Sequence, residues 1–419
     1  MNIIIHRGTN EVGGSCVEIN CKDSCILIDF GIPLSFDFDE DINSVLPEPL
    51  YSNIINGNKK IDALVLSHAH LDHYGLIGKL PKEIPIYMGE ATAELIRYSD
   101  NFAANKIGQI KPIIFNDHEL FKIGSFEIMP YAADHSAFDS YAFLITNDNK
   151  SIFYSGDFRG HGHEHEKFDN LICNPPKVDL LLMEGTLIGD RMDEKNITES
   201  EVERKLVGLC RETKGTVFVT VPGQNIDRII SIYNAAKQTG RKFIIDLHSA
   251  ELFDRLKNYS TNIPQSSYPD VLLWYPKFQR ENLKNHGLGW LMIKHRPWKK
   301  TLKDFSSEIP KSIMMLRPYC RTEIENNADL SGSVWVYSMW KGYLERKKSL
   351  QDLKQWTEYK GIPLKFLHTT GHAYLQDLKR LAKGLSPQVL IPIHSYHCEL
   401  FSEHFENVHR LEDGEKFEV

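Results

Sequence analysis

Short apolar runs separated by turn residues fill the chain from its start to about residue 190. The runs are rich in Ile, Val, Leu and Phe, which is typical of strands, and several suit strands that are buried on both faces of a sheet. Between them lie segments in which apolar residues have helical spacing, such as 91–106. The expected strands of this part are 25–31, 62–68, 125–135, 151–157 and 178–185.

The pattern changes near residue 198 to an alternation of helices and strands. A helix, a strand, a second helix closed by Gly240 and a second strand follow one another, an order that predicts a parallel α/β unit. A proline-containing, aromatic and basic stretch continues to about residue 345, and strand, helix and strand then return. These elements are expected at 200–213, 216–221, 226–240, 241–246, 364–368, 374–385 and 388–394.

This order indicates one domain interrupted by another. We expect residues 1–197 and 346–419 to form the outer domain and residues 198–345 to form the inserted one. The length of 419 residues agrees with two structural units, because a single small domain is usually much shorter.

Composition and charge narrow the class of protein. Hydrophobic residues make up 42% and charged residues 25%, as in a soluble enzyme, and no apolar run approaches the ~20 residues of a membrane-spanning helix. The N-terminus lacks the features of a signal peptide, and seven cysteines without a regular pattern suit a reducing compartment, so we expect a cytoplasmic protein without a membrane partner. The net charge of −7 means that any contact with nucleic acid needs a local basic surface.

The most specific motif is the run His68-Ala69-His70-Leu71-Asp72-His73, which directly follows a predicted strand. Residues two apart in an extended segment point the same way, so His68 and His70 can share one metal ion. Asp72 and His73 then open a helix and can face a neighbouring ion. Imidazole and carboxylate ligands suit zinc, with manganese as the alternative.

Four side chains cannot complete two metal sites, and further candidates stand at the ends of other apolar strands. Catalytic groups collect at the carboxyl ends of strands in α/β architectures. Chance histidines in a solvated loop would not show this agreement of position. The strand-end candidates are His135, Asp157, Glu184, His368 and His394.

In their order and context, these motifs resemble those of the metallo-β-lactamase superfamily, and in particular its β-CASP nuclease branch, which includes ribonuclease J. The inserted segment, including 225–242 and 340–343, resembles the β-CASP domain. The motifs that carry the resemblance are EVGGS (11–15), LIDFG (27–31), HAHLDH (68–73), LLMEGT (181–186), HTTGHA (368–373) and IPIHS (391–395).

The resemblance implies an αββα sandwich with an inserted parallel α/β domain and two zinc ions. It also implies hydrolysis of phosphodiester bonds, in RNA or single-stranded nucleic acid, by a hydroxide that bridges the metals. Asp72, Glu184 and His372 are the implied catalytic residues: Glu184 orients a ligand or catalytic imidazole, and His372 binds the scissile phosphate or protonates the leaving oxygen. The implied ligands are His68, His70 and His135 for the first metal and Asp72, His73 and His394 for the second, with Asp157 bridging both.

Two other classes of function compete with a nuclease. One is a hydrolase of a small molecule such as a thioester, lactam or cyclic phosphodiester, since fold alone does not fix the substrate. The inserted domain and His372 favour the nuclease. The other is a binding protein that has lost catalysis, against which the complete set of motif residues argues. RNA is the favoured substrate, but the choice between RNA and DNA, end-trimming or internal cutting, and a homo-oligomeric state stay open.

Three further segments have two interpretations each. The basic run 294–300, with Trp298 and Lys303, could bind the phosphate backbone of a nucleic acid and stack on a base. The alternative is an ordinary solvated face of the protein. Arg317 and Arg321 suit a bound phosphate or an internal salt bridge. The histidines at 161, 163 and 165 could form a third metal site. We favour the alternative, in which His161 packs near the wall of the site and His163 and His165 lie in a solvated loop.

Overall fold

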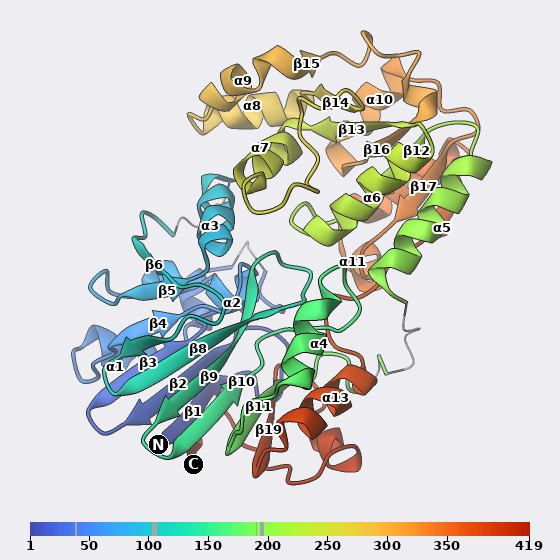
Figure 1. The fold of residues 1–419 in the computed structure, drawn as a ribbon. Coiled ribbons are helices and arrows are strands. Elements are labelled where there is room, and N and C mark those ends of the chain that lie inside the picture. Colours follow the sequence, from blue (N-terminus) through green and yellow to red (C-terminus); the bar gives the residue numbers. More distant parts are fainter. Residues whose placement is uncertain (38–39, 103–106, 190, 193–196) are drawn as a thin grey trace. The chain divides into compact units, whose positions relative to one another are not determined.

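The computed structural model describes residues 1–37, 40–102, 107–189, 191–192 and 197–419, which divide into two compact units (Figure 1). Met1–Asn196 and Gly371–Val419 form one unit, here called the outer unit. Ile197–Thr370 form the other, here called the inserted unit. No described helix is long and apolar enough to cross a membrane.

The outer unit contains two sheets. The first has the order β20-β1-β2-β3-β4-β5-β6 and the second the order β19-β11-β10-β9-β8-β7. In chain order, the strands of the first sheet are β1 Asn2–Arg7, β2 Cys16–Cys21, β3 Ser24–Ile28, β4 Ala63–Val65, β5 Ile86–Met88, β6 Pro112–Ile114 and β20 Lys416–Glu418. Those of the second are β7 Phe121–Ile123, β8 Phe126–Ala133, β9 Ser140–Asn147, β10 Lys150–Tyr154, β11 Leu180–Glu184 and β19 Val389–Ile393.

The central strand β11 shows why its sequence is apolar throughout. Successive side chains of a strand point to opposite faces of the sheet. Leu180 and Leu182 belong to the core between the two sheets, whereas Leu181 and Met183 belong to the core beneath helices α4 (His165–Cys173) and α13 (Leu375–Leu385). The second sheet is therefore covered on both faces, as the sequence pattern predicts. The other α-helices of this unit are α1 Leu50–Ile55, α2 Leu71–Tyr74 and α3 Glu90–Phe102.

The inserted unit is built on one parallel sheet with the strand order β15-β14-β13-β16-β12-β17-β18. Its strands are β12 Val217–Thr220, β13 Lys242–Asp246, β14 Val271–Trp274, β15 Lys299–Lys300, β16 Ser312–Met315, β17 Val334–Tyr337 and β18 Leu364–Phe366. Its α-helices are α5 Glu199–Glu212, α6 Ile226–Gln238, α7 Leu247–Leu256, α8 Lys277–Asn285, α9 Trp290–Lys294, α10 Arg321–Asn327, α11 Lys341–Arg346 and α12 Lys348–Tyr359. The expected fold class, a two-sheet sandwich with an inserted parallel α/β unit, is confirmed.

The inserted unit extends further along the chain than the sequence pattern indicated. We expected its end at residue 345, but the structure places it at Thr370. Strand β18 pairs with β17 of the inserted sheet, and Leu350 and Leu353 of α12 lie in the inserted core. The strand expected at 364–368 is therefore real but completes the inserted sheet. The end of the predicted helix 91–106 lies outside the described residues, which include α3 to Phe102.

Candidate metal centre

The segment between β4 and α2 carries the histidine motif, and backbone hydrogen bonds hold it in place. The amide of Phe30 donates to the carbonyl of His73 at 2.7 Å, and the amide of Ser15 donates to the carbonyl of Asp72 at 3.0 Å. The backbones approach so closely that a Cβ atom at Gly31 would overlap the Asp72 carbonyl. The two glycine-containing motifs near the N-terminus therefore fix the position of Asp72 and His73.

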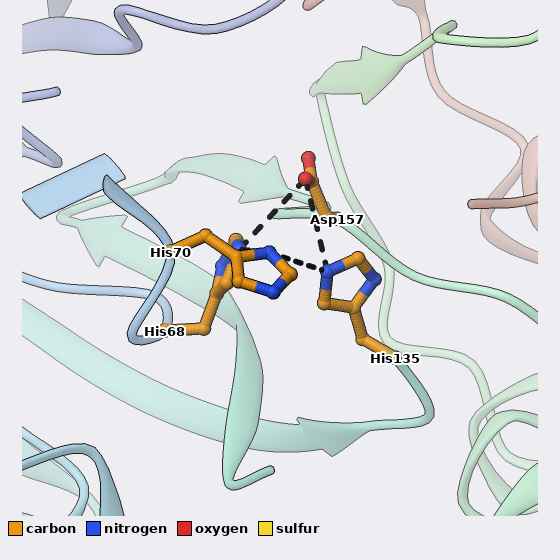
Figure 2. Close-up of side chains that lie close together, drawn as sticks. All are labelled: His68, His70, His135 and Asp157. Carbon is orange, nitrogen blue, oxygen red and sulfur yellow. Dashed lines mark hydrogen bonds and ion pairs between the residues drawn. The ribbon is translucent and has the colours of Figure 1, made fainter. Parts of the chain in front are cut away.

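The structure brings four of the expected ligands together in a first group (Figure 2). Nδ1 of His70 lies 3.2 Å from Nε2 of His68 and 3.1 Å from Nε2 of His135. Oδ2 of Asp157 lies 3.8 Å from Nε2 of His68 and 4.0 Å from Nε2 of His135. His68 and His70 follow β4, His135 follows β8 and Asp157 follows β10, so three strand ends build this group.

A second group of four shares Asp157 with the first. Nε2 of His73 lies 3.2 Å from Oδ2 of Asp157, and Nε2 of His394 lies 3.3 Å from Oδ2 of Asp72. Nδ1 of His394 lies 3.7 Å from Oδ1 of Asp157. All four side chains are buried, and one carboxylate therefore faces both groups.

Glu184 and His372 form a third such group with Asp157 and His394. Oε1 of Glu184, at the end of β11, is 3.3 Å from Nδ1 of His372. The hydroxyl of Thr186 is 3.1 Å from the same nitrogen and 2.9 Å from Nδ1 of His394. Thr186 thus connects the candidate catalytic histidine with a candidate ligand.

The chemistry of these side chains fits divalent metal ions. Nε2 of His73 and Oδ2 of Asp157 are buried 3.2 Å apart, and neither makes a hydrogen bond of regular geometry among the described residues, although buried polar atoms usually do. Burial lowers the pKa of His68 and His135 well below the ordinary value, which keeps both imidazoles in the neutral form that binds metal. Burial alone would raise the pKa of Asp157, but His394, His73 and His372 outweigh it and hold that pKa well below its usual range. The donors are imidazole nitrogens and carboxylate oxygens, a set that suits zinc, with manganese as the alternative.

Two contacts outside the ligand set orient imidazoles. Nδ1 of His73 lies 2.8 Å from Oδ2 of Asp29, and Nδ1 of His135 donates to the carbonyl of Gly371 at 2.5 Å. In both rings the opposite nitrogen, Nε2, then faces the metal groups, an arrangement common behind metal-binding histidines. Asp29 is a site residue that our sequence analysis missed. Its signal was present, because Asp29 also follows an apolar strand, within the LIDFG motif.

Four further histidines that the sequence singled out lie outside these groups. His368 belongs to the inserted unit and to none of the groups that could hold a metal among the described residues. The ring of His161 packs at 4.5 Å from that of Tyr374, and no such group in the described part of the chain includes His161, His163 or His165.

Arg317 and Cys320 have structural roles in the inserted unit. Nε of Arg317 lies 3.1 Å from Oδ2 of Asp246, so the internal salt bridge is the observed alternative. Burial raises the pKa of the Cys320 thiol well above its ordinary value, which agrees with a structural cysteine.

The chain is similar to known proteins, in part over one domain and in part over nearly its whole length. Residues 36–217 match the family described as "Beta-lactamase superfamily domain". The chain is 25% identical over 410 residues to ribonuclease J of Mycoplasma genitalium, covering 92% of this chain and 66% of that protein. It is 26% identical over 434 residues to a probable RNase of Methanocaldococcus jannaschii, covering 94% of this chain and 93% of that protein. These matches confirm the expected resemblance to the metallo-β-lactamase superfamily.

Similarity to ribonuclease J extends through the inserted unit, which supports the expected resemblance to the β-CASP branch. The chain spans about two thirds of the length of the Mycoplasma relative. It also shares its whole fold with a crystal structure of a protein of unknown function from Enterococcus faecalis V583, with a TM-score of 0.77, 22% identity and 99% of each chain covered. The expected class of protein, a metal-dependent hydrolase, is confirmed by the domain match and these relatives.

Proposed function

We propose that this protein is a zinc-dependent nuclease that hydrolyses phosphodiester bonds of RNA. The observation that carries the proposal is the position of Asp157, whose carboxylate faces two groups of imidazole and carboxylate ligands beside the Glu184–His372 pair. Relatives named ribonuclease J match more than nine tenths of the chain, including the inserted unit. Small-molecule hydrolysis, the rival interpretation, is tested by the same experiment.

Each group has the composition of one zinc site. In the proposal, the first metal is held by three imidazoles, and the second by two imidazoles and a carboxylate, with one further carboxylate common to both. Two such ions, when bound, activate a water as the nucleophile and offset the negative charge that develops on the phosphate. The proposed ligands are His68, His70 and His135, then Asp72, His73 and His394, with Asp157 shared.

His372 supplies the remaining chemistry. The carboxylate of Glu184, 3.3 Å from Nδ1, stabilises positive charge on the imidazole and fixes the plane of its ring. Nε2, on the opposite side of the ring, is then the atom that binds a phosphate oxygen or donates a proton to the leaving oxygen. Proton transfer of this kind contributes ~10²–10⁴ to a rate.

A reducing location forms part of the proposal. All seven cysteines are free, and six of them are buried. Unpaired cysteines are typical of proteins kept in a reducing compartment. We therefore place the activity in the cytoplasm.

The test is incubation of zinc-loaded protein with single-stranded RNA and DNA labelled at the 5′ or the 3′ end. The Asp72→Ala variant is the negative control, and Asp304→Ala, at an exposed aspartate of the inserted unit, is the matched positive control. We expect RNA products from the wild type and from Asp304→Ala, and none from Asp72→Ala. Intact RNA and DNA after incubation with protein that holds two metals would favour the small-molecule hydrolase instead.

A further inference from the structure

The inserted unit has a segment whose charge is opposite to that of the whole chain. Residues 277–303 contain eight Lys or Arg and a single acidic residue, Glu281, whereas the chain carries a net charge of −7. The segment comprises α8, α9, a 3-10 turn at Arg296–Trp298 and the edge strand β15 (Figure 1). Basic residues are therefore concentrated at one edge of the inserted sheet.

Large apolar side chains are exposed in the same segment. The exposed fraction is 48% for Trp290, 72% for Ile293 and 41% for Trp298, and Phe278 is 51% exposed. Single exposed apolar residues are common, but several indole and phenyl rings among cations are typical of a binding surface.

Few of the cations have a carboxylate partner. Lys294 pairs with Glu251 and Asp254 of α7, each at 2.7 Å. Nζ of Lys299 lies 5.4 Å from the ring centroid of Tyr275. In the part of the chain that the structure describes, no ion pair is formed by Lys284, Arg296, Lys299, Lys300 or Lys303.

We propose that this segment binds single-stranded RNA at a site separate from the metal centre. The binding surface consists of Trp290, Arg296, Trp298, Lys299 and Lys300, here called the basic aromatic surface. Base–aromatic stacking contributes ~1–3 kcal/mol per base, and lysines and arginines between the rings neutralise the phosphates that connect the bases. The choice of RNA rests on the proposed function, and the surface gives the enzyme a second hold on a long substrate.

A membrane-binding helix and a protected sheet edge both fit the segment less well. A helix that lies on an anionic membrane has a continuous apolar face, but α9 spans only Trp290–Lys294, and Gly287, Gly289 and Pro297 interrupt the segment. Lysines on an edge strand also prevent pairing between protein molecules. That role accounts for Lys299 and Lys300 but not for the exposed rings of Trp290 and Trp298.

The test measures binding of a fluorescent 20-nucleotide single-stranded RNA to the full chain in the non-cleaving Asp72→Ala background. We expect Lys299→Glu/Lys300→Glu to weaken binding at least tenfold and to reduce the slope of log Kd against log salt by ~1.4. Trp298→Ala should weaken binding several-fold, and Trp298→Phe should restore most of it. Lys365→Glu is the matched control, because Lys365 is exposed on β18, the opposite edge strand of the same sheet.

Unchanged affinity and salt slope in the double variant would overturn the proposal, as would an equal loss in Lys365→Glu. Aggregation of the double variant with unchanged RNA affinity would show that the two lysines only protect the sheet edge. Binding of anionic phospholipid vesicles that requires Trp290 and Trp298, with RNA affinity unaffected, would assign the surface to membranes. Cleavage of a short RNA by chains with an intact metal centre tests the proposed function separately, since that reaction does not need the surface.

Discussion

Asp157 and His372 occupy different positions in the candidate metal centre and have different proposed roles. Asp157 faces both candidate metal groups, whereas His372 contacts Glu184 and Thr186 and belongs to neither of the two proposed ligand sets. Loss of His372 should therefore affect the reaction and leave the metals in place.

We predict that His372→Ala lowers kcat for RNA cleavage by ~10²–10⁴ with unchanged metal content. Glu184→Gln should lower kcat by less, because the glutamine amide keeps the hydrogen bond to His372 but lacks the negative charge of the carboxylate. Single-turnover cleavage and elemental analysis measure the two quantities. His118→Ala, at an exposed histidine of the same unit, is the control. A full rate in His372→Ala would contradict the assigned role.

Gly31 tests the close packing around Asp72. We predict that Gly31→Ala displaces the Asp72 backbone, because the added methyl group overlaps the Asp72 carbonyl, and that metal content and cleavage both fall. Gly208→Ala in α5 meets no atom within 4 Å and should keep both. Normal metal content in folded Gly31→Ala would show that the loop tolerates this shift.

At the scale of residues, the sequence predicted the candidate metal ligands better than it predicted the residues that hydrogen-bond to those ligands. His135, Asp157 and His394 follow apolar strands, a pattern visible without coordinates. Asp29 contacts a histidine 44 positions away along the chain, and Thr186 contacts one 186 positions away, so no local spacing reveals these contacts. His368 also follows a strand, but that strand belongs to the other unit.

Buried charges join the elements of each unit. In the inserted unit, Arg228 of α6 pairs with Glu199 of α5 through both carboxylate oxygens, and both side chains are almost fully buried. A buried ion pair of this kind stabilises the packing of two helices, and removal of one partner leaves the other charge buried at a cost in stability.

We predict that Arg228→Met destabilises the protein by ~3–5 kcal/mol, because it removes the buried counter-charge that pairs with the Glu199 carboxylate. Chemical denaturation followed by circular dichroism measures the change. The control is Arg204→Met, which removes an exposed pair with Glu201 on α5 and should change stability by less than ~1 kcal/mol. Equal effects of both substitutions would contradict the role of burial.

Glu18 on β2 predicts a pH dependence. Burial alone would raise the pKa of Glu18, but hydrogen bonds with His6, Lys59 and Asn20 outweigh it and lower the pKa to about 2. Because the folded-state pKa lies below the unfolded one, Glu18 stabilises the fold fully above about pH 4.5, and this stabilisation is lost as the pH falls toward 2.

Glu18→Gln should therefore destabilise the outer unit by ~2–3 kcal/mol at neutral pH, and the difference from the wild type should shrink at about pH 3.5. Urea midpoints at the two pH values measure it. Glu127→Gln, at an exposed pair with Lys122, is the control. A difference that stays constant between the two pH values would show that Glu18 does not act through its charge.

At the scale of elements, the apolar runs assigned to strands are strands in the structure, but β9 and β14–β17 were not expected and the second domain boundary was wrong. The run at 364–368 follows the inserted stretch and precedes the last motifs, so its sequence fits either sheet. Its pairing with β17 decides the question, and strand pairing is a non-local property.

For the whole molecule, the two units carry different parts of the proposed activity. The proposed metal ligands all lie in the outer unit, and the basic aromatic surface lies in the inserted unit. Metal chemistry and the additional RNA contact can therefore be removed independently by substitution, which separates the two proposals experimentally.

The central claim is that two metal ions in this centre are needed to cleave RNA. It is tested most directly by titrating zinc into chelator-treated protein while recording metal bound per chain and cleavage of labelled single-stranded RNA. We predict no cleavage without metal and a maximal rate once about two equivalents are bound. Full cleavage by metal-free protein, or intact RNA when both equivalents are bound, would contradict the claim.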